Sequence, residues 1–245
     1  MNMKKLLLLC LSCFLFGCAN RLPIAIDSSS ARLDIGDQSL LLLTVDISRA
    51  EKSRFMPIPD YLFLDLPGND GKTTGKMVPL DGDGYLYPDD EHAIYAFRFK
   101  VPPGEVRIKA VTGRAKAFPI SGFFVLPIGM TVQANKGVAT YIGRIDALLR
   151  PRTDQEYRAG GVIPLIDQAI TGLSTGTFDV QIKDMSSEDL KLLRSAYPAI
   201  AATPIETRIS SIVSRDILDR QWRGEDGKVA TTNKVDTSAN QEGQK

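Results

Sequence analysis

The stretch that decides the fold is YAFRFKVPPGEVRIKA, which runs from Tyr95 to Ala110. From Tyr95 to Val101, and again from Val106 to Ala110, apolar side chains alternate with small or charged ones. A period of two residues is typical of a β-strand with one buried face. Between the two runs, Pro103 fixes its own φ and Gly104 tolerates a positive φ, which are the requirements of a type II turn. The stretch therefore predicts a hairpin of two half-buried antiparallel strands.

Further strands are expected on both sides of this hairpin. The segment Ser39–Ser48 opens with four leucines, which predicts either a strand buried on both faces or a short helix. A second hairpin is expected over Thr131–Ile145, with its turn at Asn135–Gly137. Tyr61–Leu66 and Phe178–Ile182 have the composition of strands. Short strands separated by Gly and Pro turns predict a mainly β chain, with an immunoglobulin-like or transthyretin-like β-sandwich over residues 39–183.

Residues 184–222 are expected to form a small C-terminal helical segment. Its first helix begins with Ser186 as the N-cap and ends at Pro198. A second helix is predicted to begin after Thr203, with Pro204 in its first turn. Its apolar residues recur at helical spacing and are Ile205, Ile209, Ile212, Val213 and Ile217. Residues 223–245 contain few apolar side chains, so we expect a disordered tail there.

The N-terminus has the pattern of a secretory signal. Two lysines, at positions 4 and 5, precede the apolar run Leu6–Phe16, which is too short to cross a bilayer core of about 30 Å. The following Leu15-Phe16-Gly17-Cys18-Ala19 resembles the lipobox of bacterial lipoproteins, although Phe16 is bulkier than the Ser, Ala or Thr that this family prefers. The resemblance implies removal of residues 1–17, transfer of diacylglycerol to the sulfur of Cys18 and acylation of the new N-terminus. The alternative is a buried apolar helix that starts the chain.

The same resemblance implies a location and a partner. Fatty acyl chains on Cys18, such as palmitate, make the lipid bilayer the expected partner. Ala19 stands where an Asp would favour retention in the inner membrane of Gram-negative bacteria, so the outer membrane is expected in such an organism. Residues 18–38 are expected to form the lipidated cysteine and a tether, because Asn20–Arg32 is polar and has little periodicity.

A second resemblance rests on two short motifs of the predicted sandwich. The turn Pro102-Pro103-Gly104 leads into a strand, and further along a Gly precedes Tyr141-Ile142-Gly143-Arg144-Ile145. Together the motifs resemble a β-sandwich domain that recurs in uncharacterised bacterial lipoproteins. The resemblance covers Tyr95–Ile145; it supports the fold and implies no activity.

The composition excludes several kinds of chemistry. The chain has 245 residues and a formal net charge of +1, so it has no basic field for a nucleic-acid partner. Its three cysteines are Cys10, Cys13 and Cys18, and its single histidine is His92. Disulfides, zinc clusters and cysteine nucleophiles are therefore excluded from the rest of the chain. Two lysines leave with the predicted signal, so 28 basic residues then face 29 acidic ones and the net charge becomes −1.

The most conspicuous polar cluster is acidic and lies just before His92. It consists of Asp81, Asp83, Asp89, Asp90 and Glu91. An EF-hand loop that starts at Asp81 needs an oxygen ligand at its fifth position, which is Tyr85, so this motif fails. The chain has no Gly-x-Ser-x-Gly nucleophile elbow to accompany His92. Two hypotheses stay open for the carboxylates near 81–91, an envelope hydrolase and a cation-stabilised binding domain. No catalytic residue, metal ligand or cofactor is assigned.

One apolar stretch is a candidate binding surface. Phe118–Pro127 predicts either a buried strand with proline near both ends or an exposed loop that docks a partner. An envelope protein is the partner expected there. The leading hypothesis from the sequence is a lipid-anchored envelope protein that acts by tethered binding and not by catalysis.

Overall fold

The computed structural model describes residues 20–50, 55–68, 72–88, 92–117, 120–161 and 171–225. In these ranges the chain forms two β-sheets and two short α-helices, which confirms the predicted mainly β sandwich with a small helical segment. The strands are β1 (Ser39–Arg49), β2 (Ile58–Pro67), β3 (Thr73–Pro79), β4 (Tyr85–Pro88), β5 (His92–Val101), β6 (Gly104–Ala117), β7 (Ile120–Ala134), β8 (Ala139–Pro151), β9 (Gly176–Lys183) and β10 (Ile205–Thr207). The helices are α2 (Ser186–Ala196) and α3 (Arg215–Trp222), and the 3₁₀ turns are η1 (Gly82–Gly84) and η3 (Pro198–Ile200).

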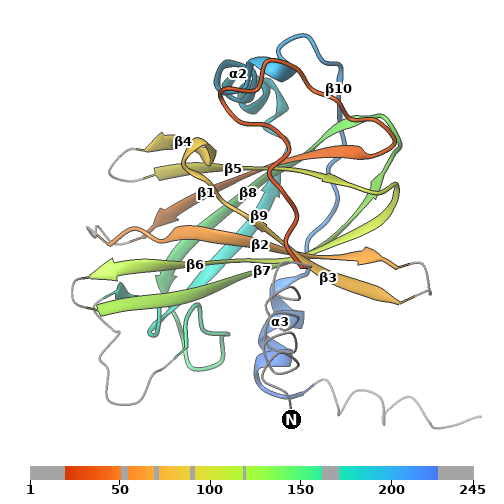
Figure 1. The fold of residues 1–245 in the computed structure, drawn as a ribbon. Helices are drawn as coiled ribbons and strands as arrows, with labels where there is room; N and C mark the ends of the chain where they lie inside the picture. Colours follow the sequence, from red (N-terminus) through yellow and green to blue (C-terminus); the bar gives the residue numbers. More distant parts are fainter. Residues whose placement is uncertain are drawn as a thin grey trace, which may run out of the picture.

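The two sheets pack face to face. The six-stranded sheet has the order β10–β8–β1–β5–β4, with β9 pairing with the second half of β8, and the four-stranded sheet has the order β3–β2–β6–β7. In Figure 1 the four-stranded sheet lies below the six-stranded one, and α2 lies above the latter. Alternate side chains from both sheets fill the core between them. No helix in the described ranges has the length and apolar content that crossing a membrane requires.

The four leucines of β1 are buried on both faces of their sheet. Leu41 and Leu43 face the core between the sheets, and Leu40 and Leu42 belong to a second apolar cluster beneath α2. β1 is a central strand, antiparallel to β5 and parallel to β8. The strand interpretation of this segment is therefore confirmed. A strand covered on both faces needs no polar positions, which is why its start reads as an unbroken apolar run.

The predicted hairpin of residues 95–110 is wrong, because its two strands belong to different sheets. β5 pairs with β1 and β4, whereas β6 pairs with β2 and β7. The Pro102–Gly104 turn therefore carries the chain from one sheet to the other, and Gly104 has the expected positive φ, 135°. The apolar faces of the two strands do meet, but across the core. Alternation identifies the buried face of a strand and does not identify the strands beside it.

The second predicted hairpin, Thr131–Ile145, is wrong for the same reason. β7 pairs with β6, and β8 pairs in parallel with β1. Gly137 has the positive φ expected of it, 72°, so the turn exists but joins the two sheets. The described chain does form hairpins between β2 and β3, between β4 and β5, and between β6 and β7.

The first predicted helix is confirmed as α2. It ends before Pro198, as expected, but Ser186 is its first helical residue and Met185 is its N-cap. Leu193 and Tyr197 are fully buried in the second apolar cluster, on the face of the six-stranded sheet that points away from the core.

The second predicted helix is wrong over its first half. Ile205–Thr207 forms β10 beside β8, and α3 begins only at Arg215. The segment between them runs along an edge of the sandwich, where the amide of Arg208 donates to the carbonyl of Tyr141 and the amide of Val213 donates to the carbonyl of Ile128, both at 2.9 Å. Pairing with strand edges therefore prevails over the local helix signals.

A buried carboxylate fixes α2 to the sheet beneath it. Asp189 is fully buried and accepts hydrogen bonds from Thr44 of β1 and from Tyr141 and Arg144 of β8. The Nε atom of Arg144 lies 3.1 Å from Oδ1 of Asp189. Burial raises the pKa of Tyr141, so its hydroxyl stays protonated and donates to the carboxylate. Three donors from two strands thus satisfy one helical carboxylate in the interior.

A second buried charge lies on β5. The alternation of this strand predicts a solvent-facing Arg98, but its side chain is only 1% exposed. Its guanidinium donates to both carboxylate oxygens of Asp81, at 2.9 and 2.7 Å, and to the carbonyl of Ile26 at 2.9 Å. It also stacks 4.4 Å from the ring centre of Tyr197. Arg98 therefore joins the N-terminal segment, η1 and the end of α2 to the sheet.

Candidate functional site

The described chain enters the fold directly after the predicted lipidation site. Cys18 lies outside the described residues, and Asn20, two positions later, already pairs with β3: the amide of Met77 donates to the carbonyl of Asn20 at 2.9 Å, and the amide of Leu22 donates to the carbonyl of Met77 at 2.9 Å. Arg21 thus extends the four-stranded sheet beyond β3. Its guanidinium stacks 5.2 Å from the ring centre of Tyr61 and donates to the hydroxyl of that residue.

The predicted tether over Asn20–Arg32 is therefore wrong. After Arg21 the chain crosses to the other sheet, where Ile24 pairs with Phe99 of β5 and the amide of Ala25 donates to the carbonyl of Arg98 at 3.0 Å. Ile26 is buried in the second apolar cluster. The segment is polar on average, but it contains Ile24 and Ile26, which contact the six-stranded sheet. Only residue 19 separates this packed segment from the predicted lipidation site, Cys18.

The acidic cluster is used largely by the fold where it is described. Asp81 caps η1 by accepting from the amide of Gly84 at 2.9 Å and also binds Arg98. Asp83 accepts from the amide and hydroxyl of Ser28 at 2.9 and 2.8 Å. The amide hydrogen bond from Ser28, together with its hydroxyl, holds the pKa of Asp83 below its ordinary value. Both carboxylates thus hold the N-terminal segment and the loop in place.

The other members of the acidic cluster are not described. Asp89, Asp90 and Glu91 lie outside the described ranges, and His92 is described only as the first residue of β5, without its side chain. Within the described ranges no group of three potential ligands could hold a metal ion. The hydrolase and cation hypotheses for residues 81–91 therefore depend on side chains outside the described structure.

The apolar stretch Phe118–Pro127 proves to have two different faces. Phe118 and Pro119 lie outside the described ranges, and most of the remainder is the start of β7. Phe124 and Leu126 are buried in the core, whereas Phe123 and Val125 are 57% and 50% exposed. The stretch is therefore a strand, as one interpretation predicts, with an exposed apolar face, as the other predicts.

A polar groove lies on the open part of the six-stranded sheet, beside α2. It has a volume of about 270 Å³ and is lined by Asp46 and Ser48 of β1, Asp146 of β8, and Asp179, Gln181 and Lys183 of β9. Asp46 and Asp146 stand opposite each other in the parallel pairing, and Lys183 forms an ion pair with Asp146. The groove offers hydrogen bonds, and the charges of Asp146 and Asp179 are balanced by Lys183, Arg150 and Arg215. Sequence analysis missed it because its residues come from three strands that are far apart along the chain.

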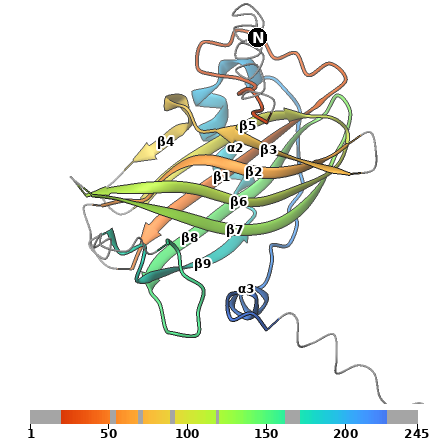
Figure 2. The same cartoon turned by 60° about the horizontal axis from the view of Figure 1, so that its bottom comes forward.

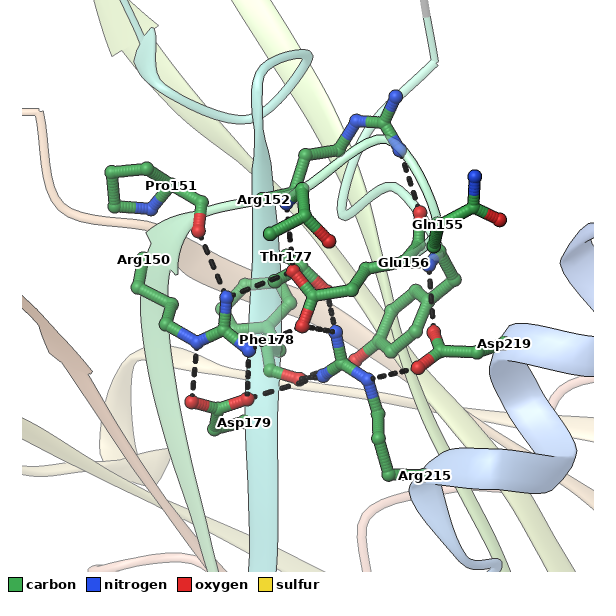
Figure 3. A network of polar contacts seen from close by, with 12 residues as sticks. Arg150, Pro151, Arg152, Gln155, Glu156, Thr177, Phe178, Asp179, Arg215 and Asp219 are labelled. Atoms are coloured by element: carbon green, nitrogen blue, oxygen red, sulfur yellow. Dashed lines mark hydrogen bonds and ion pairs between the residues drawn. The ribbon is translucent and has the colours of Figure 1, made fainter.

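A network of ion pairs adjoins the groove at Asp179 and connects β8 and β9 with α3 (Figure 3). Arg150 binds Asp179 at 2.6 Å and Glu156 at 2.5 Å, and Arg215 of α3 binds the same two carboxylates at 3.2 and 3.0 Å. Arg215 also stacks 4.6 Å from the ring centre of Tyr157. Two guanidinium groups therefore share two carboxylates, and this network attaches α3 to the sandwich.

This network predicts a pH dependence of stability. The hydrogen bond from Arg150, helped by the nearby charges, lowers the pKa of Glu156 from 4.5 to about 2. A carboxylate with a depressed pKa in the folded state stabilises the protein above its ordinary pKa, and that contribution disappears as the pH falls through the folded value. The wild-type protein should therefore lose more stability between pH 4.5 and pH 2 than the variant Glu156→Gln.

Urea denaturation at a series of pH values measures this difference. Asp154→Asn is the matched control. Asp154 is fully exposed, and its ion pair with Arg152 is long, at 3.7 Å, so it should contribute little to stability. The control should keep the wild-type slope of unfolding free energy against pH. A slope for Glu156→Gln equal to that of the wild type would contradict the prediction.

The chain was compared with protein-family models, with curated proteins and with solved structures. None of the three comparisons found a match.

Proposed function

We propose that this protein is an envelope lipoprotein, exported by residues 1–17 and anchored to a bilayer by acyl chains on Cys18, whose β-sandwich acts as a tethered binding module. The observation that carries the proposal is the sequence pattern in which Lys4 and Lys5 precede the apolar run Leu6–Phe16, which ends in the lipobox-like Leu15–Ala19. The lipobox-like sequence Leu15–Ala19 supplies the chemistry of the anchor.

The anchor is strong enough to determine where the protein resides. Each buried CH₂ of an acyl chain contributes about 0.8 kcal/mol, so two or three chains hold a protein to a membrane almost permanently. Ala19 favours the outer membrane if the organism is Gram-negative. Besides the bilayer, an envelope protein is the partner that we propose for the sandwich.

Metabolic labelling with palmitate tests the anchor. The wild-type chain should incorporate label, appear in the membrane fraction and migrate as a processed form. Cys18→Ala should lose the label and remain at the mass of the precursor, because the acyl acceptor is gone. Cys13→Ala is the matched control and should behave like the wild type. Equal labelling of the wild type and Cys18→Ala would overturn the proposal.

A further inference from the structure

The outer face of the four-stranded sheet carries an apolar stripe, in which Phe123 and Val125 are exposed and the other members are half-buried. The stripe consists of Met77 of β3, Tyr61 and Phe63 of β2, and Phe123, Val125 and Pro127 of β7. Its members alternate along their strands with core residues such as Leu62, Leu64, Phe124 and Leu126. Register connects the stripe across the sheet, because Met77 lies opposite Phe63, which lies opposite Ala110 of β6, which in turn lies opposite Pro127.

The two sheets differ in how their outer faces are covered. Part of the six-stranded sheet is covered by α2 and η3, which form the second apolar cluster with it. In Figure 2 no described helix crosses β2, β6 or β7. Phe123 and Val125 accordingly keep half or more of their surface exposed. Large apolar side chains that stay exposed on one face of a folded domain mark a place where something binds.

The stripe is bordered by basic side chains. Strand β6 directs its charged side chains away from the core, and Lys109 and Arg114 pair with Asp65 and Asp60 of β2 at 3.6 and 3.1 Å. With Glu105 as a third acid, the acidic residues of this face are outnumbered by the basic ones, which are Arg21, Arg107, Lys109, Arg114 and Lys116. The face is therefore net positive, whereas the chain without residues 1–17 is net negative. An anionic surface is the complementary partner.

The position of the predicted anchor specifies which anionic surface this is. Asn20 lies on the edge of β3, and the guanidinium of Arg21 stacks on Tyr61 within the stripe. Cys18 is two residues earlier, so a fully extended chain can place it at most about 7 Å from Asn20. The acyl chains would therefore be attached close to the β3 edge of this face, with no long linker between the membrane and the sheet.

We propose that the outer face of the four-stranded sheet lies on the bilayer. Phe123 and Val125 would lie at the boundary between the headgroups and the acyl chains, and the β6 cations would contact anionic phospholipid. Aromatic and basic residues are the side chains that favour this interface. The inference rests on the proposed anchor and adds an orientation to it. The polar groove beside α2, on the opposite sheet, then points away from the membrane.

Fluorescent labelling of the acylated full-length protein in vesicles tests the orientation. After processing, Cys18 is blocked by lipid, so an introduced cysteine is the only free thiol. Val125→Cys places a polarity-sensitive label on the stripe, and Lys191→Cys places it on the exposed surface of α2 as the matched control. In vesicles of phosphatidylcholine and phosphatidylglycerol, the Val125→Cys label should shift to the blue and be quenched by brominated acyl chains. The control label should do neither.

Each outcome distinguishes the orientation from the anchor. Protein that fails to float with the vesicles would refute the anchor itself. Protein that floats but carries a Val125→Cys label as solvent-exposed as the control would overturn the orientation and leave the anchor intact. The double variant Arg107→Glu/Lys116→Glu, labelled at the same site, should still float but lose quenching; unchanged quenching would refute the role of the cations. Circular dichroism of each variant checks that the sandwich is folded.

Discussion

Replacing Asp189 with alanine should lower the free energy of unfolding by about 3–5 kcal/mol, the range for breaking a buried ion pair on one side. The substitution leaves the Arg144 guanidinium buried without its carboxylate and removes the acceptor for the hydroxyls of Thr44 and Tyr141. α2 should also be held less firmly to the six-stranded sheet, because the carboxylate is its buried polar contact with β1 and β8, while apolar packing, including that of Leu193, and a partly exposed Glu188 contact remain. Urea denaturation followed by circular dichroism measures the change.

Two further variants make this prediction specific. Glu188→Ala is the matched control on the same helix: its carboxylate is 63% exposed and 4.0 Å from Arg144, so its removal should cost less than about 1 kcal/mol. The double variant Arg144→Met/Asp189→Leu should recover part of the loss, since an apolar pair of similar size often replaces a buried ion pair without cost. Recovery should be incomplete because the hydroxyls of Thr44 and Tyr141 lose their carboxylate acceptor and keep only long hydrogen bonds, of 3.5 Å, to each other and to the carbonyl of Gly143. A cost below about 1 kcal/mol for Asp189→Ala would contradict the assigned role.

The second large effect is expected from Arg98→Met. The substitution keeps an apolar stem of similar length but removes the donors to Asp81 and Ile26 and the cation above Tyr197. We expect a loss of about 3–5 kcal/mol, because the carboxylate of Asp81 is left partly buried without its guanidinium. Hydrogen exchange should also speed up at the amide of Ala25, which donates to the carbonyl of Arg98.

Lys100→Met is the matched control for this variant. Lys100 is two residues along the same strand, on the same face, and its ammonium makes only an exposed hydrogen bond to the carbonyl of Asp34, 3.1 Å away. This control should cost less than about 1 kcal/mol and leave exchange at Ala25 unchanged. Equal costs for the two variants would mean that the contacts of Arg98 contribute no more than a surface lysine.

The fold could be predicted from local patterns to the level of elements but not of pairing. The leucines of β1 and the apolar face of α2 are visible because burial and periodicity are properties of neighbouring residues. The hairpin predictions failed because β5 and β6 share a turn without sharing a sheet, and neighbours in a sheet are decided by packing between distant segments. The helix expected from Ile205 failed because β8 offers that segment an edge to pair with.

Some candidate sites could be suggested from the sequence, and others could not. Cys18 can be proposed as a lipidation site because a lipobox-like motif is contiguous in the sequence. The tether after it was misjudged, since Ile24 and Ile26 are recognised as packed residues only beside β5. Arg98 was expected to face solvent because the sequence of β5 gives no sign that Tyr197, at the end of α2, covers it. The groove that brings Asp46 to Asp146 depends on a parallel pairing that no local pattern encodes.

The parallel pairing of β1 with β8 also bears on how such a chain is made. Leu41 of β1 needs Phe99 on one side and Thr140 on the other, so the central strand of the sheet has high contact order. In the export that we propose, the chain would cross the membrane N-terminus first. More than half of its length would then have to cross before β1 could pair with both β5 and β8. The central strand of this sheet would therefore gain its second neighbour only after most of the chain had crossed.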